Sequence, residues 1–376
     1  MKKIIVLTEN FFTLRDVDRM GIKYLKNFFS VDIIDLTYYF NKKYFIEKYD
    51  DIKHKVLVKE IRKVKDFYKY IKNSNNIILA IDHLGLHSKS NNLRIFLSSV
   101  GIKVLRLNCG SVPEKTYFRN TKKLLSKGKF FKIYSKTISF FQNHSKVKNY
   151  RKNVDLDLVS GLVSEKASPN KKLYGHSFDY GSYLNNSKNV RLIKKPYAVF
   201  LDEMIPNTPE YLLIRHAKPI SYNLYWEKIS VTLEKIRKKL KMDIIVALHP
   251  RNSNKNKYLK NFICKKYVTA NLVINSELAL LHTSTAVSYT IITKKPLIYL
   301  NSEKYSFQAN RIKYLHEVTG GTLLNVEENI ENQIDEKSLY KIDKKKYNNY
   351  LDNYLKHPLS KNLTVPELIK KYVQTI

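Results

Sequence analysis

Short runs of apolar residues alternate with longer amphipathic stretches along this chain. Strands buried on both faces form near-continuous apolar runs, and amphipathic stretches form the helices that connect them. In the first half we expect strands at residues 3–7, 31–36, 76–81 and 101–107, and helices at residues 17–29 and 56–73. Strands that alternate with helices in this way predict the α/β fold class with parallel sheets.

The second half repeats this alternation. We expect strands at 197–201, 242–248, 278–281 and 296–300, helices at 226–240 and 287–293, a short apolar segment at 272–274, and Lys- and Tyr-rich helices around Pro358 and Pro366. A chain of 376 residues exceeds what one hydrophobic core usually serves. We therefore predict two Rossmann-like domains that face a cleft, with residues 1–185 in the first and 186–376 in the second.

Residues 115–153 differ in composition from the rest of the chain. They contain twelve Lys or Arg residues and no Asp or Glu, and Phe131, Tyr134, Ile138 and Phe141 recur at helical spacing. A basic amphipathic helix of this kind indicates contact with an anionic membrane surface. The alternative is a helix that packs on the core and exposes a basic face to solvent.

The charge of the whole chain points to anionic partners. With 68 Lys and Arg against 33 Asp and Glu, the net charge is +35, which attracts nucleic acid, anionic lipid and phosphorylated substrates. However, the sequence contains no helix-turn-helix, zinc-finger, RRM or KH signature, and its basic residues are spread along the chain. Nucleic-acid binding is therefore the alternative, and we expect no nucleic-acid partner.

Several classes of protein are excluded or disfavoured by motifs that the chain lacks. Its two cysteines, Cys109 and Cys264, cannot form a disulfide framework or a Cys-rich zinc site. Neither a GxxxxGK[ST] nor a GxGxxG phosphate loop occurs. The apolar run at residues 4–7 is too short for a signal peptide or a membrane span. We expect a cytoplasmic protein, or one held peripherally on the inner face of the cytoplasmic membrane.

The strongest chemical signal lies at two strand ends of the second half. One strand is followed by His249, Pro250 and Arg251, and another by Ser284 and Thr285 just before a helix. Carboxyl ends of parallel strands share one edge of the sheet, and hydroxyls with free N–H groups at a helix start suit a phosphate. An imidazole nearby can bond or protonate that phosphate. The alternative is an N-capping hydroxyl and a loop histidine.

This pair of strand ends resembles the donor site of GT-B glycosyltransferases that use CMP-activated sugars, the bacterial sialyltransferases and Kdo transferases. The stretches Tyr197–Glu203 and Gly175–Tyr180, with Pro206 and Pro209–Tyr211, are similar to segments of the β-Kdo transferases, and the likeness extends over about residues 175–300. It implies transfer of Kdo or a related nonulosonate from a CMP-sugar to a glycan or glycolipid acceptor, in lipopolysaccharide or capsule assembly. The Asp-Asp-Gly or Glu-Asp-Gly motif of the sialyltransferases is absent.

The resemblance also implies roles for individual residues. His249, Pro250, Arg251, Ser284 and Thr285 would bind the CMP phosphate. Asp202 would be the carboxylate at the anomeric carbon, as the nucleophile of a retaining double displacement or as an orienting group. A further carboxylate from the first half would be Glu114 or Asp82, and neither aligns with a motif.

No cofactor and no metal are expected. A CMP donor leaves with one phosphate, so neither a Gly-rich cradle nor a metal ion is obligatory. Two metal sites are weaker alternatives: Asp155 with Asp157, which have Asp-x-Asp spacing, and a zinc site of His249 with other histidines (His176, His216 and His282). A GT-B transferase with UDP-sugar or CDP-glycerol as donor is the alternative for the function.

Overall fold

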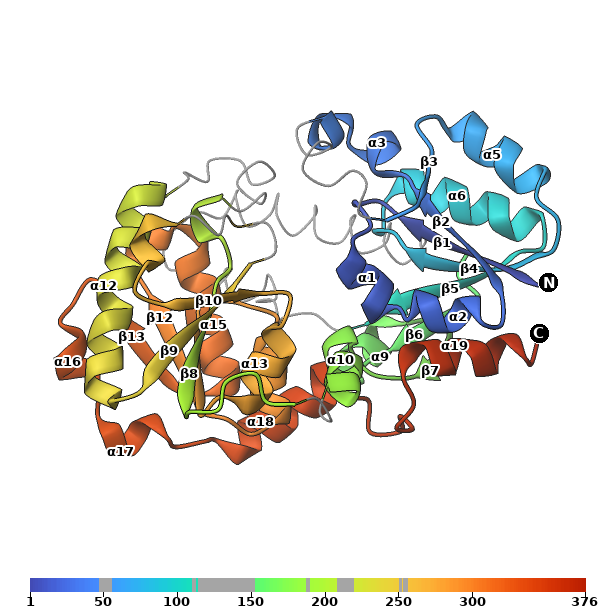
Figure 1. The fold of residues 1–376 in the computed structure, drawn as a ribbon. Helices are drawn as coiled ribbons and strands as arrows, with labels where there is room; N and C mark the ends of the chain where they lie inside the picture. Colours follow the sequence, from blue (N-terminus) through green and yellow to red (C-terminus); the bar gives the residue numbers. More distant parts are fainter. Residues whose placement is uncertain are drawn as a thin grey trace, which may run out of the picture. The chain divides into compact units, whose positions relative to one another are not determined.

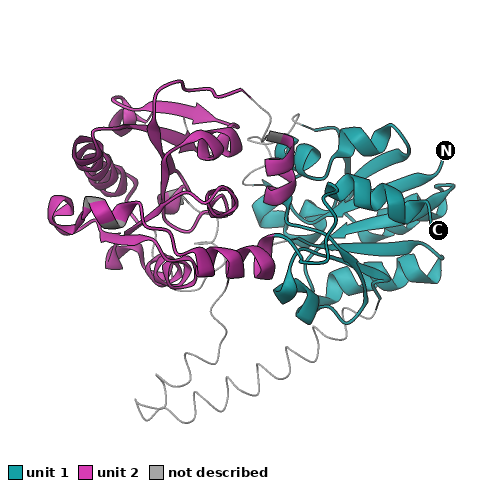
Figure 2. Ribbon diagram, turned by 90° about the horizontal axis from the view of Figure 1, so that it is seen from below, with its two compact units in different colours: residues 1–110, 116–178, 356–376 teal, residues 111–115, 179–355 magenta. Residues whose placement is uncertain are grey.

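The computed structural model describes residues 1–46, 56–109, 113, 153–186, 190–207, 220–249, 252 and 256–376. These residues form two compact units (Figure 2). Unit 1 holds those within residues 1–110, 116–178 and 356–376, and unit 2 those within 111–115 and 179–355. The predicted basic segment 115–153 lies outside the described residues, except for its last residue, Asn153.

Unit 1 is built on a seven-stranded sheet in the order β3-β2-β1-β4-β5-β6-β7, and all its neighbouring strands are parallel. Its strands are β1 (Lys3–Thr8), β2 (Ser30–Asp35), β3 (Lys59–Glu60), β4 (Ile77–His83), β5 (Lys103–Asn108), β6 (Leu156–Val159) and β7 (Lys171–Tyr174). Its helices are α1 (Leu14–Arg19), α2 (Ile22–Lys26), α3 (Thr37–Phe40), α5 (Val64–Lys72), α6 (Ser88–Ser99), α9 (Leu162–Ala167) and α19 (Val365–Val373).

Each face of this sheet has its own core. Successive residues of a strand face opposite sides, so Ile4 and Val6 of β1 pack with α1, α2 and α19, whereas Ile5 and Leu7 pack with α5 and α6. Figure 1 shows α19 beside α2. Covering both faces buries the whole apolar run, which explains why the sequence of β1 does not alternate with polar residues.

Unit 2 has a six-stranded parallel sheet in the order β10-β9-β8-β11-β12-β13. Its strands are β8 (Tyr197–Leu201), β9 (Asp243–Leu248), β10 (Ile263–Lys266), β11 (Leu278–Leu281), β12 (Leu297–Asn301) and β13 (Thr322–Asn325). Its helices are α10 (Phe178–Asn186), which begins at the boundary, α12 (Tyr222–Leu240), α13 (Thr269–Asn275), α14 (Val287–Ile292), α15 (Phe307–Thr319), α16 (Ile330–Gln333), α17 (Glu336–Leu339) and α18 (Lys344–Tyr350), which continues as a π-helical turn (Leu351–Leu355). Short 3₁₀ helices span Ile205–Asn207, Lys257–Leu259 and Glu303–Tyr305.

Two parallel-sheet α/β domains of Rossmann type confirm the predicted fold class. The predicted division into 1–185 and 186–376 needs correction at the C-terminus, because residues 356–376 return to unit 1. The His176 ring donates from Nε2 to the Leu363 carbonyl (2.7 Å), and the His357 ring donates from Nε2 to Glu165 (2.9 Å). These bonds, with the buried apolar face of α19, attach the C-terminal segment to unit 1.

Three predicted elements also differ from the structure. The helix expected at 17–29 is two helices, because Gly21 adopts a left-handed φ of 60° and lies against Pro366. The helix expected at 56–73 begins only at Val64, since Lys59–Glu60 pairs with β2 as an edge strand. The apolar segment 272–274 is the buried side of α13.

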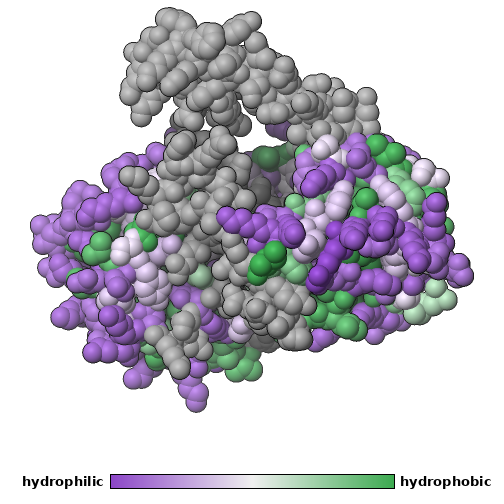
Figure 3. All heavy atoms as spheres, turned by 90° about the horizontal axis from the view of Figure 1, so that it is seen from above, coloured by the Kyte–Doolittle hydropathy of each residue, from purple (hydrophilic) through white to green (hydrophobic). Residues whose placement is uncertain are grey.

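The face of the molecule in Figure 3 is mostly hydrophilic, and apolar side chains appear there in scattered groups. No helix among the described residues has the length and apolar character needed to cross a membrane.

Candidate active site

The strand order of unit 2 marks one place at the carboxyl edge of its sheet. β9 and β10 lie on one side of β8, and β11, β12 and β13 lie on the other. The direction in which successive strands are added to the sheet therefore reverses between β8 and β11. Parallel α/β sheets bind ligands in the crevice outside the carboxyl ends of such a strand pair. Asp202 and Glu203 follow β8 at this point, and His282 to Thr285 follow β11.

Asp202 joins the end of β8 to the loop after β9. Its Oδ1 accepts the Met204 N–H (2.9 Å), and its Oδ2 accepts the His249 N–H (3.0 Å) and the Asn252 side-chain amide (2.7 Å). Only 5% of the residue is exposed, and burial raises the pKa of its carboxyl, although the bonds from Asn252, Met204 and His249 oppose the rise. Both carboxylate oxygens are engaged, so Asp202 fixes the position of His249.

Glu203 makes the corresponding connection to the loop after β11. Its carboxylate accepts the His282 N–H (2.8 Å), the Thr283 N–H (2.7 Å) and the Thr283 hydroxyl (2.8 Å). The Ser284 N–H is bonded to it as well. Burial raises the pKa of Glu203 to about 7, even though these donors favour the charged form. Glu203 thus holds the loop that presents Ser284 and Thr285.

The predicted phosphate-binding groups lie on the two loops that these carboxylates hold. His249 is half-buried, Ser284 is half-buried and Thr285 is exposed. The Ser284 hydroxyl accepts the Ala286 N–H (3.2 Å) at the start of α14. Pro250 and Arg251 lie outside the described residues. The structure therefore brings an imidazole and two hydroxyls to the ends of β9 and β11, which flank β8.

Two further residues, Asn252 and Lys266, support the loop after β9. Asn252 bonds Asp202 through its amide, and its carbonyl accepts the Lys266 ammonium at the end of β10. Lys266 also lowers the pKa of Asp202 through its charge. Neither residue was predicted, because no motif marks them. Glu203 was not among the predicted site residues either, and its adjacency to Asp202 was the only signal.

His282, the other described histidine of the second half that was considered as a zinc ligand, is structural. His282 is fully buried, its Nδ1–H donates to the Leu300 carbonyl (2.6 Å), and its Nε2 accepts the Tyr225 hydroxyl (2.9 Å). Burial lowers its pKa to about 4, so the ring is neutral at ordinary pH. With both nitrogens bonded inside the protein, His282 cannot join His249 in a zinc site, and His216 lies outside the described residues.

In unit 1, both carboxylate oxygens of Asp82 also accept hydrogen bonds. Its Oδ2 accepts the Arg94 guanidinium (2.7 Å), its Oδ1 accepts the Leu84 N–H (3.1 Å), and both charged side chains are completely buried. Burial with these partners disfavours the predicted role of Asp82 as a reacting carboxylate. Glu114, the other candidate, lies outside the described residues.

The two carboxylates of the predicted Asp-x-Asp pair also bond other groups of unit 1. Asp155 bonds Lys103 (3.0 Å) and the Val104 N–H (2.9 Å), and Asp157 is buried against the Ser168 hydroxyl (2.5 Å). Within the described parts of the chain, no three His, Cys, Asp or Glu side chains gather where they could hold a metal ion.

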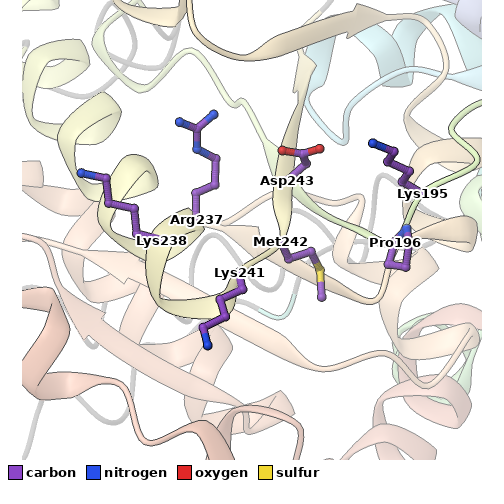
Figure 4. Close-up of a pocket in the computed structure, with 7 residues that line it drawn as sticks. All are labelled: Lys195, Pro196, Arg237, Lys238, Lys241, Met242 and Asp243. Atoms are coloured by element: carbon purple, nitrogen blue, oxygen red, sulfur yellow. The ribbon is translucent and has the colours of Figure 1, made fainter.

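A basic hollow of about 420 Å³ lies at the opposite edge of the unit 2 sheet (Figure 4). It is lined by the loop before β8, the end of α12 and the start of β9: Lys195, Pro196, Arg237, Lys238, Lys241, Met242 and Asp243. The five residues of β8 lie between Pro196 and Asp202, and these six residue steps span roughly 20 Å at about 3.3 Å per residue. The hollow is therefore no part of the candidate active site.

The sequence matches no protein-family model and no curated protein. Among solved structures, the chain is similar to the UDP-GlcNAc 2-epimerase of Methanocaldococcus jannaschii, with a TM-score of 0.53 and 16% identity over 100% of both chains. A putative UDP-N-acetylglucosamine 2-epimerase from Listeria monocytogenes has a TM-score of 0.52 and 10% identity over 99% of this chain and 94% of that one. Phytolacca americana UGT2, solved with UDP-2fluoro-glucose and pterostilbene, has a TM-score of 0.50 and 10% identity over 100% of this chain and 99% of that one. At such low identity the likeness establishes the fold, which is that of GT-B glycosyltransferases and UDP-sugar epimerases.

Proposed function

We propose that this protein is a glycosyltransferase that binds a sugar nucleotide at the carboxyl edge of unit 2. The observation that carries the proposal is the convergence of His249, Ser284 and Thr285 on loops that two carboxylates, the buried Asp202 and the half-buried Glu203, hold beside the switch point. Imidazole and hydroxyl groups suit the phosphate of a leaving nucleotide, and fixing them in advance favours the transition state. The GT-B fold supports the same class of reaction.

The donor that we propose is a CMP-linked 2-keto acid sugar, Kdo or a related nonulosonate, and the acceptor is a glycan or glycolipid of the bacterial surface. The His249-Pro250 strand end and the Ser284-Thr285 pair support this donor, since a single phosphate needs no Gly-rich cradle. Neither a cofactor nor a metal ion takes part in this proposal. Asp202 orients the site through His249, because both its carboxylate oxygens already accept hydrogen bonds.

A UDP-sugar transferase or epimerase is the second candidate. The observation that favours it is that the three similar structures carry UDP-sugar or UDP-linked names, and none names a CMP-sugar. Their identities of 10 to 16% leave the choice of base and sugar open.

Calorimetry with CMP, UDP and a DNA duplex separates these candidates, followed by CMP-release assays with CMP-Kdo and CMP-sialic acid. We expect CMP to bind, UDP to bind more weakly, and a CMP-sugar to release CMP. Tight binding of UDP without CMP would replace the proposed donor by a UDP-sugar. Binding of DNA alone would remove the enzyme assignment.

We also propose that the protein attaches peripherally to anionic membranes on the cytoplasmic side, where a glycolipid acceptor would lie. The net charge of +35 supports this, at about 1 kcal/mol for each basic residue near an anionic surface. Sedimentation with phosphatidylglycerol vesicles at low salt, and release as salt rises, is the expected result. Equal recovery with neutral phosphatidylcholine vesicles would contradict it.

A further inference from the structure

The segments that precede the strands of unit 2 are rich in lysine. Because all neighbouring strands of this sheet are parallel, these segments lie at one edge, the amino edge, opposite the candidate active site. β8 and β12 even follow the same three residues, Lys-Lys-Pro, at 194–196 and 294–296. The eight lysines of this edge, which we call the basic edge, are Lys194 and Lys195 before β8, Lys238, Lys239 and Lys241 before β9, Lys260 before β10, and Lys294 and Lys295 before β12.

Three of these lysines meet at the basic hollow. Lys195, Lys238 and Lys241 line it with Arg237, and Asp243 is the one carboxylate among its described lining residues. Figure 4 shows that the side chains of Lys238 and Lys241 extend in different directions. The positive groups therefore do not converge on one point, as they would around a single small anion, but spread over a surface.

Few carboxylates compensate this charge. Glu277 precedes β11, between the two Lys-Lys-Pro segments, and it pairs with Arg191 (3.8 Å). Glu234 pairs with Arg237 (2.8 Å). Within the described part of the chain, none of the eight lysines of the basic edge forms an ion pair, and six of them are exposed. Their mutual repulsion is unfavourable unless a polyanion binds.

The end of a helix accounts for only some of these lysines. Lys238 and Lys239 lie in the last turn of α12, where cations interact favourably with the helix dipole. Lys194, Lys195 and Lys260 lie outside the α-helices, so no such interaction explains them.

Two lysines even occupy positions where the backbone favours other residues. Lys241 follows α12 and Lys294 lies shortly after α14, and their φ angles are 50° and 52°. The left-handed conformation after a helix is ordinarily that of Gly or Asn, because a Cβ there lies too close to the following carbonyl. Local conformation therefore does not explain lysine at either position, whereas a requirement for charge does.

Apolar side chains are exposed at the same edge. Leu192, shortly before β8, and Ile263, the first residue of β10, are each 50% exposed. At the surface of an anionic bilayer, ammonium groups meet phosphates while apolar side chains enter the boundary of the acyl chains. From β10 to β12 the edge extends over four strand spacings, about 19 Å at roughly 4.8 Å each. A charged surface of this width with aliphatic side chains suits a bilayer better than one phosphate group.

We propose that the basic edge of unit 2 binds the phosphate headgroups of anionic phospholipids, so that unit 2 docks on a membrane through its amino edge. This inference rests on the proposed peripheral attachment and names the surface that makes it. It does not depend on which nucleotide the donor contains. Since β8 separates Pro196 from Asp202 by roughly 20 Å, lipid and CMP should bind to unit 2 without competing.

The Lys241→Asn/Lys294→Asn double variant tests the charge apart from the fold. Asn suits the left-handed backbone, so the thermal midpoint should equal or exceed that of wild type. Affinity for phosphatidylglycerol vesicles, measured by sedimentation at low salt, should fall by about fivefold for each lysine that reaches the surface. CMP affinity should stay at the wild-type value. Lysines with a merely structural role would change the thermal midpoint and leave vesicle binding unchanged.

Lys195→Glu and Lys304→Glu form a matched pair. Both residues are exposed, both belong to unit 2, and each change lowers the net charge of +35 by two. Lys304 follows β12, at the carboxyl edge of the sheet, where its exposed pair with Glu327 contributes little to stability. We expect Lys195→Glu to weaken vesicle binding by more than about fivefold and Lys304→Glu to bind nearly as wild type does. Equal losses would mean that only the net charge matters, and would overturn the inference.

Two other anions separate the possible ligands. Soluble glycerol phosphate, at the concentration of the lipid phosphate, should not release the protein from vesicles, because a single anion contacts few of the spread ammonium groups. Release would make the hollow a small-anion site and overturn the docking surface. Binding of a DNA duplex that Lys195→Glu weakens, without binding of vesicles, would make the basic edge a nucleic-acid surface instead.

Two further failures can be told apart. If wild type does not sediment with phosphatidylglycerol vesicles, the proposed attachment fails and this inference fails with it, while CMP binding still decides the proposed transferase. If wild type sediments and the variants of the basic edge match it, the attachment stands and the basic edge is not its surface. The predicted basic segment 115–153 would then be the next to test.

Discussion

The Glu203 carboxylate accepts both the backbone N–H and the side-chain hydroxyl of Thr283, at 2.7 and 2.8 Å. This contact joins the ends of β8 and β11 across the switch point of unit 2. A carboxyl that accepts several N–H bonds ordinarily stays ionised at low pH, but burial here raises the pKa of Glu203 to about 7. The loop that presents Ser284 is therefore held by a group that titrates near neutral pH.

Glu203 should make the stability of the protein depend on pH. The ordinary pKa is 4.5 and the folded value is about 7, so the folded state binds the proton more tightly between these values. The free energy of unfolding should then fall as pH rises through this interval, by at most about 3 kcal/mol. Urea unfolding at several pH values should show a smaller fall in Glu203→Gln than in wild type.

Glu327→Gln provides a control of opposite sign. Lys304 holds the pKa of Glu327 below its usual value, so this carboxylate contributes stability that is lost as pH falls. Removing it should leave the fall between pH about 4.5 and 7 unchanged. Parallel pH profiles for wild type and Glu203→Gln would contradict the raised pKa.

Asp202→Asn should destabilise the protein even though the shapes of the two side chains match. The Asp202 Oδ2 accepts two donors, the His249 N–H and the Asn252 amide. In one orientation the amide NH₂ of an asparagine would face the His249 N–H and the Asn252 amide, and in the other it would face the Met204 N–H. Either way a donor faces a donor. Leaving buried donors unsatisfied costs about 1–3 kcal/mol each, so we expect a loss of about 2–4 kcal/mol in urea unfolding.

The matched control is Asp243→Asn at the other end of the neighbouring strand, where the side chain is exposed and should tolerate the change. Asp202→Asn should also raise the KM for the donor, because His249 loses its anchor. A variant as stable as wild type that has lost all transfer would contradict the positioning role. It would instead support Asp202 as the nucleophile, as would a covalent sugar adduct in mass spectrometry of wild type with donor alone.

The strands that could be predicted from the sequence are those buried on both faces. Residues 197–201 and 278–281 are uninterrupted apolar runs, and the structure has strands with these bounds. The edge strand β10 was not predicted, because its four residues (Ile-Cys-Lys-Lys) are half lysine and only its pairing with β9 reveals it. An amphipathic pattern predicts a helix but not its partner, so the return of residues 356–376 to unit 1 was not predictable.

The same distinction applies to the candidate site. Alternation along an extended segment predicts that Asp202 and Glu203 point in opposite directions. The loops that the two carboxylates bind are determined by β9 and β11 lying on either side of β8. That strand order is set by the packing of the whole sheet. The role of Glu203 as a holder of the β11 loop therefore could not be inferred from residues near it in the sequence.

His249→Ala should weaken CMP binding by about 2–4 kcal/mol if the imidazole bonds a charged phosphate oxygen. Calorimetry measures this loss. His316→Ala is the control, because His316 is also half-buried in unit 2 but lies at the end of α15, where its ring bonds the Gly321 carbonyl. Unchanged CMP affinity in His249→Ala would mean that the nucleotide binds elsewhere.

The buried pair of Asp82 and Arg94 should contribute through stability and not through chemistry. Asp82→Leu leaves the Arg94 charge buried without its carboxylate, which we expect to cost about 3–5 kcal/mol in urea unfolding. Arg94→Met leaves the opposite charge and also removes the donors to the Leu84 and Gly85 carbonyls. The double variant contains neither charge, so its loss should be well below the sum of the two single losses.

An exposed pair calibrates this double-mutant cycle. Lys103 and Asp155 are 52% and 31% exposed, and their coupling should not exceed about 1 kcal/mol. The Asp82→Leu/Arg94→Met double variant then decides between the two roles of Asp82. At a temperature where it is folded, this variant should still hydrolyse a CMP-sugar. Complete loss of hydrolysis with CMP affinity and folding intact would instead make Asp82 a reacting carboxylate.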